Sequence, residues 1–349
     1  MWSRSELETA LVEAGLGEWA ARLAQLAKHS IILVAGSIDE AANAPVGPSR
    51  LGGAPDLPPD VDWPTRPPLN VKLDAAEAAV PGDVLLGPYH WLHRLVRSQR
   101  WKDASQKWKA ELQAVACVRG RTWPLSFVAQ VDFAELHAVQ ALEGFPSAGR
   151  LLLFCDPFDL PWGKQEDQAR ARVIFLEVPA ERLERRPFPT DFGGPEARRV
   201  MPRGYAFKSR LLRPEAWLLP PPQGPGPLLG LDSEAAKAWA PDAEAYRAYE
   251  QFWCNLYARH PQTFGEQGQN IHQVGGVAVP VQAPVEEEAA RLSGADPAKA
   301  PSWRLVLQID SDIEAGMELG DGGRLYVCLR DQDLRSRQFD RSWTILQTY

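Results

Sequence analysis

The chain has 349 residues, of which 45% are hydrophobic and 24% are charged, the proportions of a soluble globular protein. Its formal net charge of −7 disfavours non-specific binding to nucleic acid or to an anionic membrane. The four cysteines lie far apart and form no Cys-x-x-Cys pair, so neither a disulfide framework nor a zinc site is expected.

The composition also bears on element length and on location. The 31 prolines and 27 glycines favour many short elements joined by turns over long helices. The N-terminal residues lack the basic start and apolar core of a signal peptide. No apolar run approaches the roughly 20 residues needed to cross a bilayer. We therefore expect a cytoplasmic protein without a membrane span.

The chain begins with a predicted helix and a predicted strand. Residues 5–28 carry apolar side chains at roughly helical spacing, and Ser5 is the expected N-cap. The run Ile-Ile-Leu-Val at 31–34 is typical of a short strand. A proline-rich loop at 48–58 follows, and its two adjacent glycines suit either a tight structural turn or a loop that cradles a ligand.

The pattern changes between residues 66 and 120, which predict a helical insertion. A stripe of apolar residues from Trp101 to Val115 has helical spacing. Residues 94–109 are strongly basic and interleaved with tryptophans, a pattern found on solvated helix faces and on surfaces that bind RNA or membranes. We interpret the basic residues as a solvated face and consider nucleic acid an improbable partner.

The rest of the chain alternates strand-like runs with other segments. Residues 181–230 are rich in proline and predict an irregular connection. Residues 233–259 have helical periodicity, interrupted at Pro241. Apolar runs typical of strands occupy residues 125–132, 149–160, 172–178, 303–310, 323–334 and 343–346.

Three short motifs recur in the same order, which indicates an internal duplication. Each copy has a Gly-Gly pair, then a strand ending Gln-x-Asp, then a strand opening Gly-Arg-Leu. Residues 149–160 and 323–334 align without gaps and share Gly, Arg, Leu, Asp and Leu. We therefore predict one β-rich α+β unit, with a first repeat at about 31–65 and 121–180 and a second at about 262–349.

Familiar catalytic and metal-binding motifs are absent. There is no Gly-x-Ser-x-Gly elbow, no His-Glu-x-x-His and no phosphate-binding Gly-rich loop. The acidic stretch from Asp310 to Asp321 resembles a calcium loop only loosely, because Ala315 stands where an EF-hand needs Gly. No metal or cofactor is predicted.

The duplicated polar residues are the main candidates for a site. Gln130 and Gln308 lie inside apolar strands and need hydrogen-bond partners there. An aspartate follows each glutamine by two positions and so shares its strand face. These side chains could tie down the Gly-Gly loops or line a polar cleft. The candidate binding residues are Arg50, Gly52, Gly53, Gln130, Asp132, His272, Gly275, Gly276, Gln308 and Asp310.

The ordered motifs resemble those of the YwqG-like family of bacterial proteins of unknown function. They include the Gly-Gly loops at 49–58 and 272–276, the strands that end Gln-x-Asp, and the Gly-Asp-Gly-Gly-Arg-Leu run at 320–325. The resemblance implies a β-rich fold and brings no established activity, cofactor or catalytic residue. The chain departs from the family at the 66–120 insertion and at Leu319, where the family usually has Trp.

Three functions remain open from the sequence, the least favoured being a nucleic-acid or membrane-surface adaptor that acts through residues 94–109. The leading hypothesis is a binding or interaction protein that holds a small ligand or a partner protein between the two repeats. The alternative is a hydrolase in which His272 acts as a base with Asp132 or Asp310.

Overall fold

The computed structural model describes residues 2–69, 99–156, 159–189, 206–222, 231, 233–239, 242–265, 270–296, 300 and 302–349. The chain divides into two compact units. The larger unit comprises residues 1–62, 126–188 and 206–349, and the smaller comprises 63–125 and 189–205.

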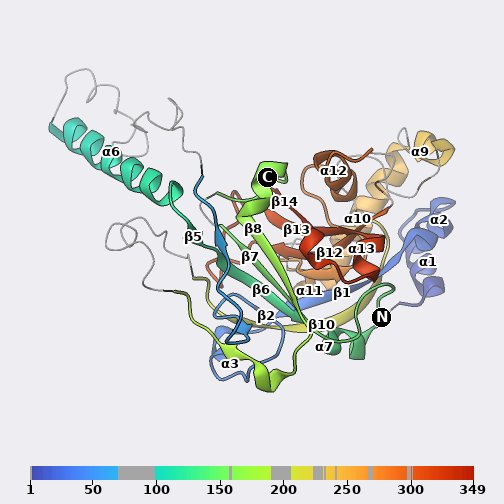
Figure 1. The fold of residues 1–349 in the computed structure, drawn as a ribbon. Coiled ribbons are helices and arrows are strands. Elements are labelled where there is room, and N and C mark those ends of the chain that lie inside the picture. The colour runs from blue at the N-terminus through green and yellow to red at the C-terminus, as the bar shows by residue number, and fades with distance from the viewer. Residues whose placement is uncertain are drawn as a thin grey trace. The chain divides into compact units, whose positions relative to one another are not determined.

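Ten of the described strands form one antiparallel sheet in the larger unit (Figure 1). Its spatial order is β14-β13-β12-β11-β1-β10-β2-β6-β7-β8. The predicted β-rich α+β fold is therefore confirmed. The strands are β1 (Lys28–Ala35), β2 (Arg50–Leu51), β6 (Ser126–Asp132), β7 (Arg150–Cys155), β8 (Ala171–Leu176), β10 (Arg210–Leu219), β11 (Gln273–Gly275), β12 (Trp303–Asp310), β13 (Arg324–Arg330) and β14 (Trp343–Gln347).

The sheet consists of two equivalent halves that meet at the β1–β10 pair. We call β10-β2-β6-β7-β8 the first half-sheet and β1-β11-β12-β13-β14 the second. β1 precedes β2 in the chain but pairs with β10 and β11, whereas β10 precedes β11 but pairs with β1 and β2. Counted by this pairing, the second copy begins at β10, upstream of the predicted start at about residue 262, and each copy contributes its first strand to the half-sheet of the other copy.

The two halves also share an irregularity of register. In the β6–β7 pair the register shifts between Phe127 and Ala129, and in the β12–β13 pair it shifts between Leu305 and Leu307. A β-bulge at the same position of both copies is a specific feature of backbone geometry. It supports the duplication more strongly than the short matches of sequence do.

The inner face of the sheet encloses an apolar core with residues from both half-sheets. Phe133, Phe175 and Phe339 meet there, with Phe175 and Phe339 ring centroids 4.6 Å apart. Alternate side chains of a strand point to the same face, and Leu151 and Leu153 of β7 both belong to this core. The inside of the nearly closed sheet is thus packed with side chains.

Both outer strands of the sheet are covered. The β14 backbone donates from Leu346 N to Pro161 O at 2.8 Å and from Thr344 N to Gln168 Oε1 at 3.0 Å. The short helix η4 (Phe339–Arg341) packs on β8. The segment before β8 thus bonds to the outer edge of β14, and the segment before β14 packs on β8, so that each edge strand is covered by residues next to the other.

Helices cover the outer face of the sheet. A second apolar cluster joins the outer side of β1 and β10 to the two N-terminal helices and to helices within residues 233–264. In Figure 1, α1, α2 and α9 lie at the same side. A third cluster lies under α12 (Val285–Leu292). The helices of the second cluster are α1 (Arg4–Glu13), α2 (Trp19–Leu26), α9 (Ser233–Trp239), α10 (Ala243–Arg259) and α11 (Pro261–Phe264).

The remaining elements are short. Within the larger unit, β3 pairs with β9, and α7 and α13 each follow directly after a strand of the sheet. These elements are α3 (Ile38–Ala42), β3 (Asp56–Leu57), α7 (Phe133–Val139), η1 (Gln165–Arg170), η2 (Ala180–Arg182), β9 (Glu184–Arg185) and α13 (Asp331–Arg335).

The smaller unit contains the described part of the predicted insertion. α6 (Gln99–Arg119) is a helix of 21 residues, and β4 (Thr65–Arg66) pairs with β5 (Trp123–Pro124). The buried Arg66 donates to the carbonyls of Arg119 and Arg121, which ties the end of the helix to the strand pair. Residues 70–98 of the insertion lie outside the described residues.

The N-terminal helix differs from the expectation. Instead of one helix over 5–28, two helices form, and Ser3 rather than Ser5 caps the first through a capping box with Glu6. Gly15 and Gly17 between them have φ of 89° and 47°. Positive φ ends an α-helix, and glycine adopts it without strain.

The prediction that residues 181–230 are an irregular connection was wrong for residues 210–219, because these form the central strand β10. Pro214 and the following proline-rich run hid the strand. Leu33, opposite Pro214, donates its N–H to the carbonyl of His272, just before β11, and not towards β10. Pro214 N therefore faces the β2 side, where β2 pairs only with residues 210–211 and no ladder bond is lost.

We predict that Gly276→Ala destabilises the protein by about 2–4 kcal/mol, from positive φ plus overpacking. Its φ is 74°, and an added Cβ would lie 1.8 Å from Ser30 Oγ on β1. Gly316→Ala is the matched control, because its φ is 68° and no atom lies within 4 Å of the added Cβ. Urea unfolding measures both. Equal losses in the two variants would show that the close approach to β1 contributes nothing.

Candidate functional site

The structure places the predicted polar residues in the interior of the larger unit. The relative exposure of the six side chains ranges from 0% to 7%. Those of the first copy lie on β2 and β6, and those of the second copy lie on or beside β11 and β12. The six are Arg50, Gln130, Asp132, His272, Gln308 and Asp310.

The two glutamines make the same pair of backbone contacts. Gln130 accepts from Asp56 N at 2.9 Å and donates to Pro48 O at 2.8 Å. Gln308 accepts from Val279 N at 2.9 Å and donates to Ile271 O at 2.8 Å. Each amide thus joins the two arms of a Gly-Gly loop and replaces the hydrogen bonds to water that burial removes.

The two aspartates are each paired with the arginine of the following Gly-Arg-Leu motif. Asp132 lies 2.7 Å from Arg150 Nη2, and Asp310 lies 2.7 Å from Arg324 Nε. Asp132 also accepts from Ala134 N and caps α7, whereas Asp310 accepts from Ile271 N. The carboxylates therefore fix the connections that leave the sheet.

The glycines allow close packing against the exchanged strands. φ is 56° and 74° at Gly52 and Gly53, and 66° and 74° at Gly275 and Gly276. A Cβ at Gly53 would meet Ser209 beside β10 at 2.6 Å. In the second copy, a Cβ at Gly276 would meet Ser30 on β1. The paired glycines are needed because each loop turns against a strand of the other copy.

His272 differs from its counterpart Ser49. Asp132 N donates to Ser49 Oγ, and Asp310 N donates to His272 Nδ1 at 3.1 Å, so the two side chains occupy equivalent places. Because Nδ1 accepts, the imidazole proton lies on Nε2, which is 3.6 Å from Asp312 Oδ2. The carboxylate nearest the base proposed for a hydrolase is thus Asp312, and not that of Asp132 or Asp310.

Asp312 belongs to a buried charged cluster that the sequence analysis assigned only to an acidic turn. Arg210 Nη1 donates to it at 2.6 Å, and Ala315 N donates at 2.8 Å. Burial opposes its ionisation, but His272, the Ala315 N–H and Arg210 outweigh burial and hold the pKa of Asp312 well below its ordinary value. The cluster fastens the turn after β12 to the central strand β10.

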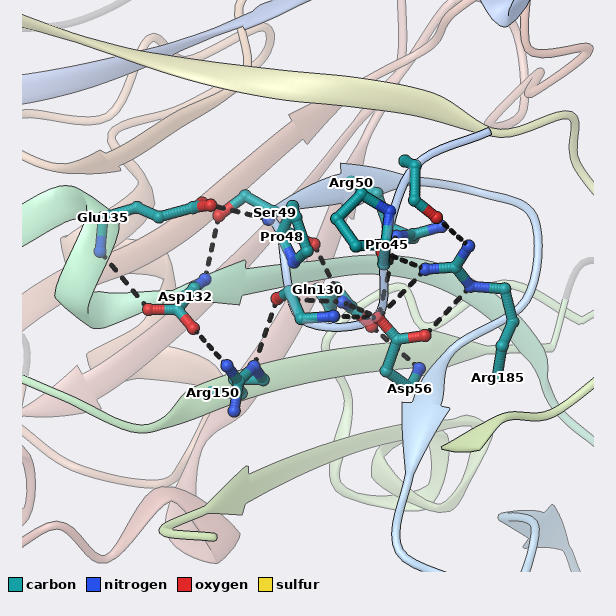
Figure 2. A network of polar contacts seen from close by, with 12 residues as sticks. Pro45, Pro48, Ser49, Arg50, Asp56, Gln130, Asp132, Glu135, Arg150 and Arg185 are labelled. Carbon is teal, nitrogen blue, oxygen red and sulfur yellow. Dashed lines mark hydrogen bonds and ion pairs between the residues drawn. The ribbon is translucent and has the colours of Figure 1, made fainter. Parts of the chain in front are cut away.

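Arg50 lies in a second charged cluster, on the first half-sheet (Figure 2). Arg50 Nη2 lies 3.6 Å from Asp56 Oδ2, and Arg185 Nε lies 3.0 Å from Asp56 Oδ1. Both arginines also donate to the carbonyl of Pro45. Burial lowers the pKa of Arg50, against the opposing effect of Asp56. Figure 2 shows these groups around the loop that precedes β2.

The predicted residues therefore act within their own half-sheets. Among the described residues, no hydrogen bond or ion pair joins the Gln130–Asp132 set to the Gln308–Asp310 set. Their bonds to loop backbone match the structural role considered for them from the sequence. A cleft common to both sets stays a prediction.

A solvent-open recess of about 560 Å³ lies elsewhere on the second half-sheet. Arg330, at the end of β13, places its guanidinium carbon 5.6 Å from the ring centroid of the buried Trp303. Arg330 forms no ion pair with any of the described residues. The recess is lined by Ser293, Gly294, Ala295, Ser302, Trp303, Arg330, Asp331 and Gln332.

Charged residues around Asp331 link this recess to the first copy. Asp331 lies 2.8 Å from Arg304 Nη1 and 2.6 Å from Arg335 Nε. Arg335 also lies 2.7 Å from Glu143, and Arg304 donates to the Glu143 carbonyl at 3.2 Å. Asp331 is thus neutralised by two arginines, and none of the described carboxylates pairs with Arg330. Neither Arg330 nor Trp303 carried a recognisable signal of a site in the sequence, because the recess forms only when α12 packs beside the ends of β12 and β13.

In the part of the chain that the structure describes, no three His, Cys, Asp or Glu residues are placed to hold a metal ion. Within the acidic stretch after β12, Asp310 pairs with Arg324 and Asp312 with Arg210. None of the described helices has the length and apolar character to cross a membrane.

Comparison with known protein families shows where the chain belongs. Residues 49–348 match a family described as a domain of unknown function, DUF1963. The match agrees with the resemblance noted from the sequence motifs, although the narrower YwqG-like assignment stays a prediction. No curated protein matches the chain.

We predict that Gln308→Met lowers the free energy of unfolding by about 2–4 kcal/mol, because it leaves the carbonyl of Ile271 and the N–H of Val279 without a partner. Gln130→Met should have a similar effect in the first copy. Gln251→Met, on the exposed face of α10, is the control. Urea unfolding of the three variants decides, and a Gln308→Met protein as stable as the control would refute the structural role.

A second prediction concerns pH. The lowered pKa of Asp312 contributes stability that is present above its unfolded-state pKa, which is about 3.9, and is lost as pH falls towards the folded-state pKa. Wild-type protein should therefore exceed Asp312→Asn most in stability at pH 7, and the difference should shrink below about pH 4. Unfolding by urea at several pH values tests this, and a pH-independent difference would contradict it.

Proposed function

The chain belongs to the DUF1963 family, whose function is unknown, and we propose from the groups on its surface that it is a binding protein for a ligand that carries an oxyanion. The ligand would lie in the recess above Trp303. The observation that supports this most directly is the exposed Arg330 guanidinium, held over an aromatic ring and without an acidic partner among the described residues.

The geometry favours an anion for two reasons. A guanidinium presents donors in a fixed plane, and attraction to the Trp303 ring favours a position of the Arg330 guanidinium over that ring. A carboxylate or phosphate accepts two such donors in parallel. In addition, Arg304, Arg330 and Arg335 face only Asp331 and Glu143 in this network, which gives the recess a local excess of positive charge on a protein of net charge −7.

Other groups of the recess can orient the remainder of a ligand. Gln332 offers an exposed amide, and the Ser293 hydroxyl, which donates to Ala290 O, can still accept a hydrogen bond. The volume of about 560 Å³ lies in the range of small-molecule sites. The Arg335–Glu143 ion pair beside the recess joins the second copy to a loop of the first, in keeping with a ligand held near the boundary of the two repeats.

We predict that benzoate, used as a simple aromatic carboxylate, binds saturably to the full chain, and that Arg330→Ala weakens the binding roughly 10- to 100-fold, the effect of losing a charged hydrogen-bond partner. Isothermal titration calorimetry measures both affinities. Arg330→Lys should restore only part of the affinity, because an ammonium group lacks the planar fork.

The matched control is Arg172→Ala, which removes an exposed arginine from β8 of the first half-sheet. Its affinity should equal that of the wild type. Inorganic phosphate, titrated separately, tests whether the apolar part of benzoate contributes. The proposal is rejected if neither anion binds, or if Arg330→Ala and Arg172→Ala have the same effect.

A further inference from the structure

Trp162 is an exposed aromatic residue on a tightly held segment. Its relative exposure is 46%, whereas its neighbours Pro161 and Gly163 are buried. Pro161 O accepts from Leu346 N at 2.8 Å, and Gly163 O accepts from Trp343 Nε1 at 2.7 Å. The backbone on both sides of Trp162 is thus fixed to β14, so the indole is held at the surface by a rigid support.

The segment that carries Trp162 packs against apolar residues beside the recess. A Cβ at Gly163 would lie 2.7 Å from Leu292 Cδ1, so this glycine packs against the last residue of α12. Leu292 immediately precedes Ser293, which lines the recess. Leu292, Ala295 and Trp343 are half-buried and pack on the same apolar cluster as Trp303. We call Trp162, Leu292, Ala295 and Trp343 the apolar strip.

The apolar strip is unsuited to recognition by strand addition. The backbone groups of β14 that face outward already bond to Pro161 and to the Gln168 side chain, which donates to Thr344 O at 3.2 Å. An added strand would have to displace both contacts. What the strip offers is side-chain surface, namely an indole ring and aliphatic groups beside a cation.

We infer that the recess and the apolar strip together bind an amphiphilic carboxylate, with its carboxylate on Arg330 and its acyl chain along Leu292 and Trp343 to Trp162. This inference rests on the function proposed above and names the ligand class. Complementarity of charge selects the carboxylate, and burial of the acyl chain against half-exposed apolar groups selects the tail. A ligand with only an oxyanion would leave the strip uncovered.

The test is a series of unbranched carboxylates from acetate to dodecanoate, each below the concentration at which it forms micelles, titrated into the full chain. Affinity should rise by up to about fourfold for each added CH₂, the effect of moving one methylene out of water. The rise should stop when the chain reaches the end of the strip. Fluorescence of the tryptophans provides a second readout, because Trp162 and Trp343 lie along the strip.

Trp162→Ala should reduce the affinity for the longest carboxylates at least tenfold and leave that for the shortest unchanged. Tyr246→Ala is the matched control, because Tyr246 is a similarly exposed aromatic residue, at 43%, on α10. It should change neither affinity. Arg330→Ala should weaken short and long carboxylates by the same factor.

The outcomes separate the two proposals. If short carboxylates bind through Arg330 but affinity does not rise with chain length, the amphiphilic ligand is excluded and the anion site stands. If long carboxylates bind equally well to Trp162→Ala and Tyr246→Ala, the strip is not the site of the chain. If no carboxylate binds, the proposed function fails, and this inference fails with it.

Discussion

The antiparallel pairing of β1 with β10 is the contact on which the structure depends. Each of these strands begins one copy of the duplication and pairs within the half-sheet of the other copy. The pairing runs from Lys28 opposite Leu219 to Ala35 opposite Leu212, and it buries apolar side chains on both faces, Ile31 and Leu33 inward and Ile32 outward. Neither half-sheet is complete without the first strand of the other copy, so the two copies form one folding unit rather than two linked domains.

The repeated polar residues follow from this exchange. A strand that pairs in the half-sheet of the other copy packs against a sharply turning loop of that copy. The Gly-Gly pairs provide the positive φ that the turn needs and the space for the close approach of the strand. The loop then has backbone groups in the interior, which a glutamine from the next strand satisfies. An aspartate two positions later pairs with an arginine of the following strand. The motif is thus a set of ties between backbone segments, and it occurs twice because the exchange occurs twice.

The two copies differ in the connections between their strands, and these connections shape the surface. The connection between β2 and β6 contains the insertion with α6, whereas the connection between β11 and β12 contains α12. Packing of α12 on β12, β13 and β14 creates the recess at Trp303 and Arg330 and brings Leu292 next to the segment that carries Trp162. The duplication supplies the framework, and the segment that is not duplicated supplies the surface proposed to bind a ligand.

The sequence by itself determined the strands with apolar alternation, the duplication and the need of Gln130 and Gln308 for buried partners, because these depend on local periodicity and on the chemistry of single side chains. It could not reveal β10, since Pro214 marks a strand break unless its neighbours are known. Nor could it distinguish a scaffold from a cleft at Gln130 and Gln308, which depends on burial. Tertiary structure alone decided that β1 pairs with β11, that His272 faces Asp312, and that Arg330 lies over Trp303. These contacts join residues that are distant in the chain, and their positions are fixed only when the whole sheet has packed.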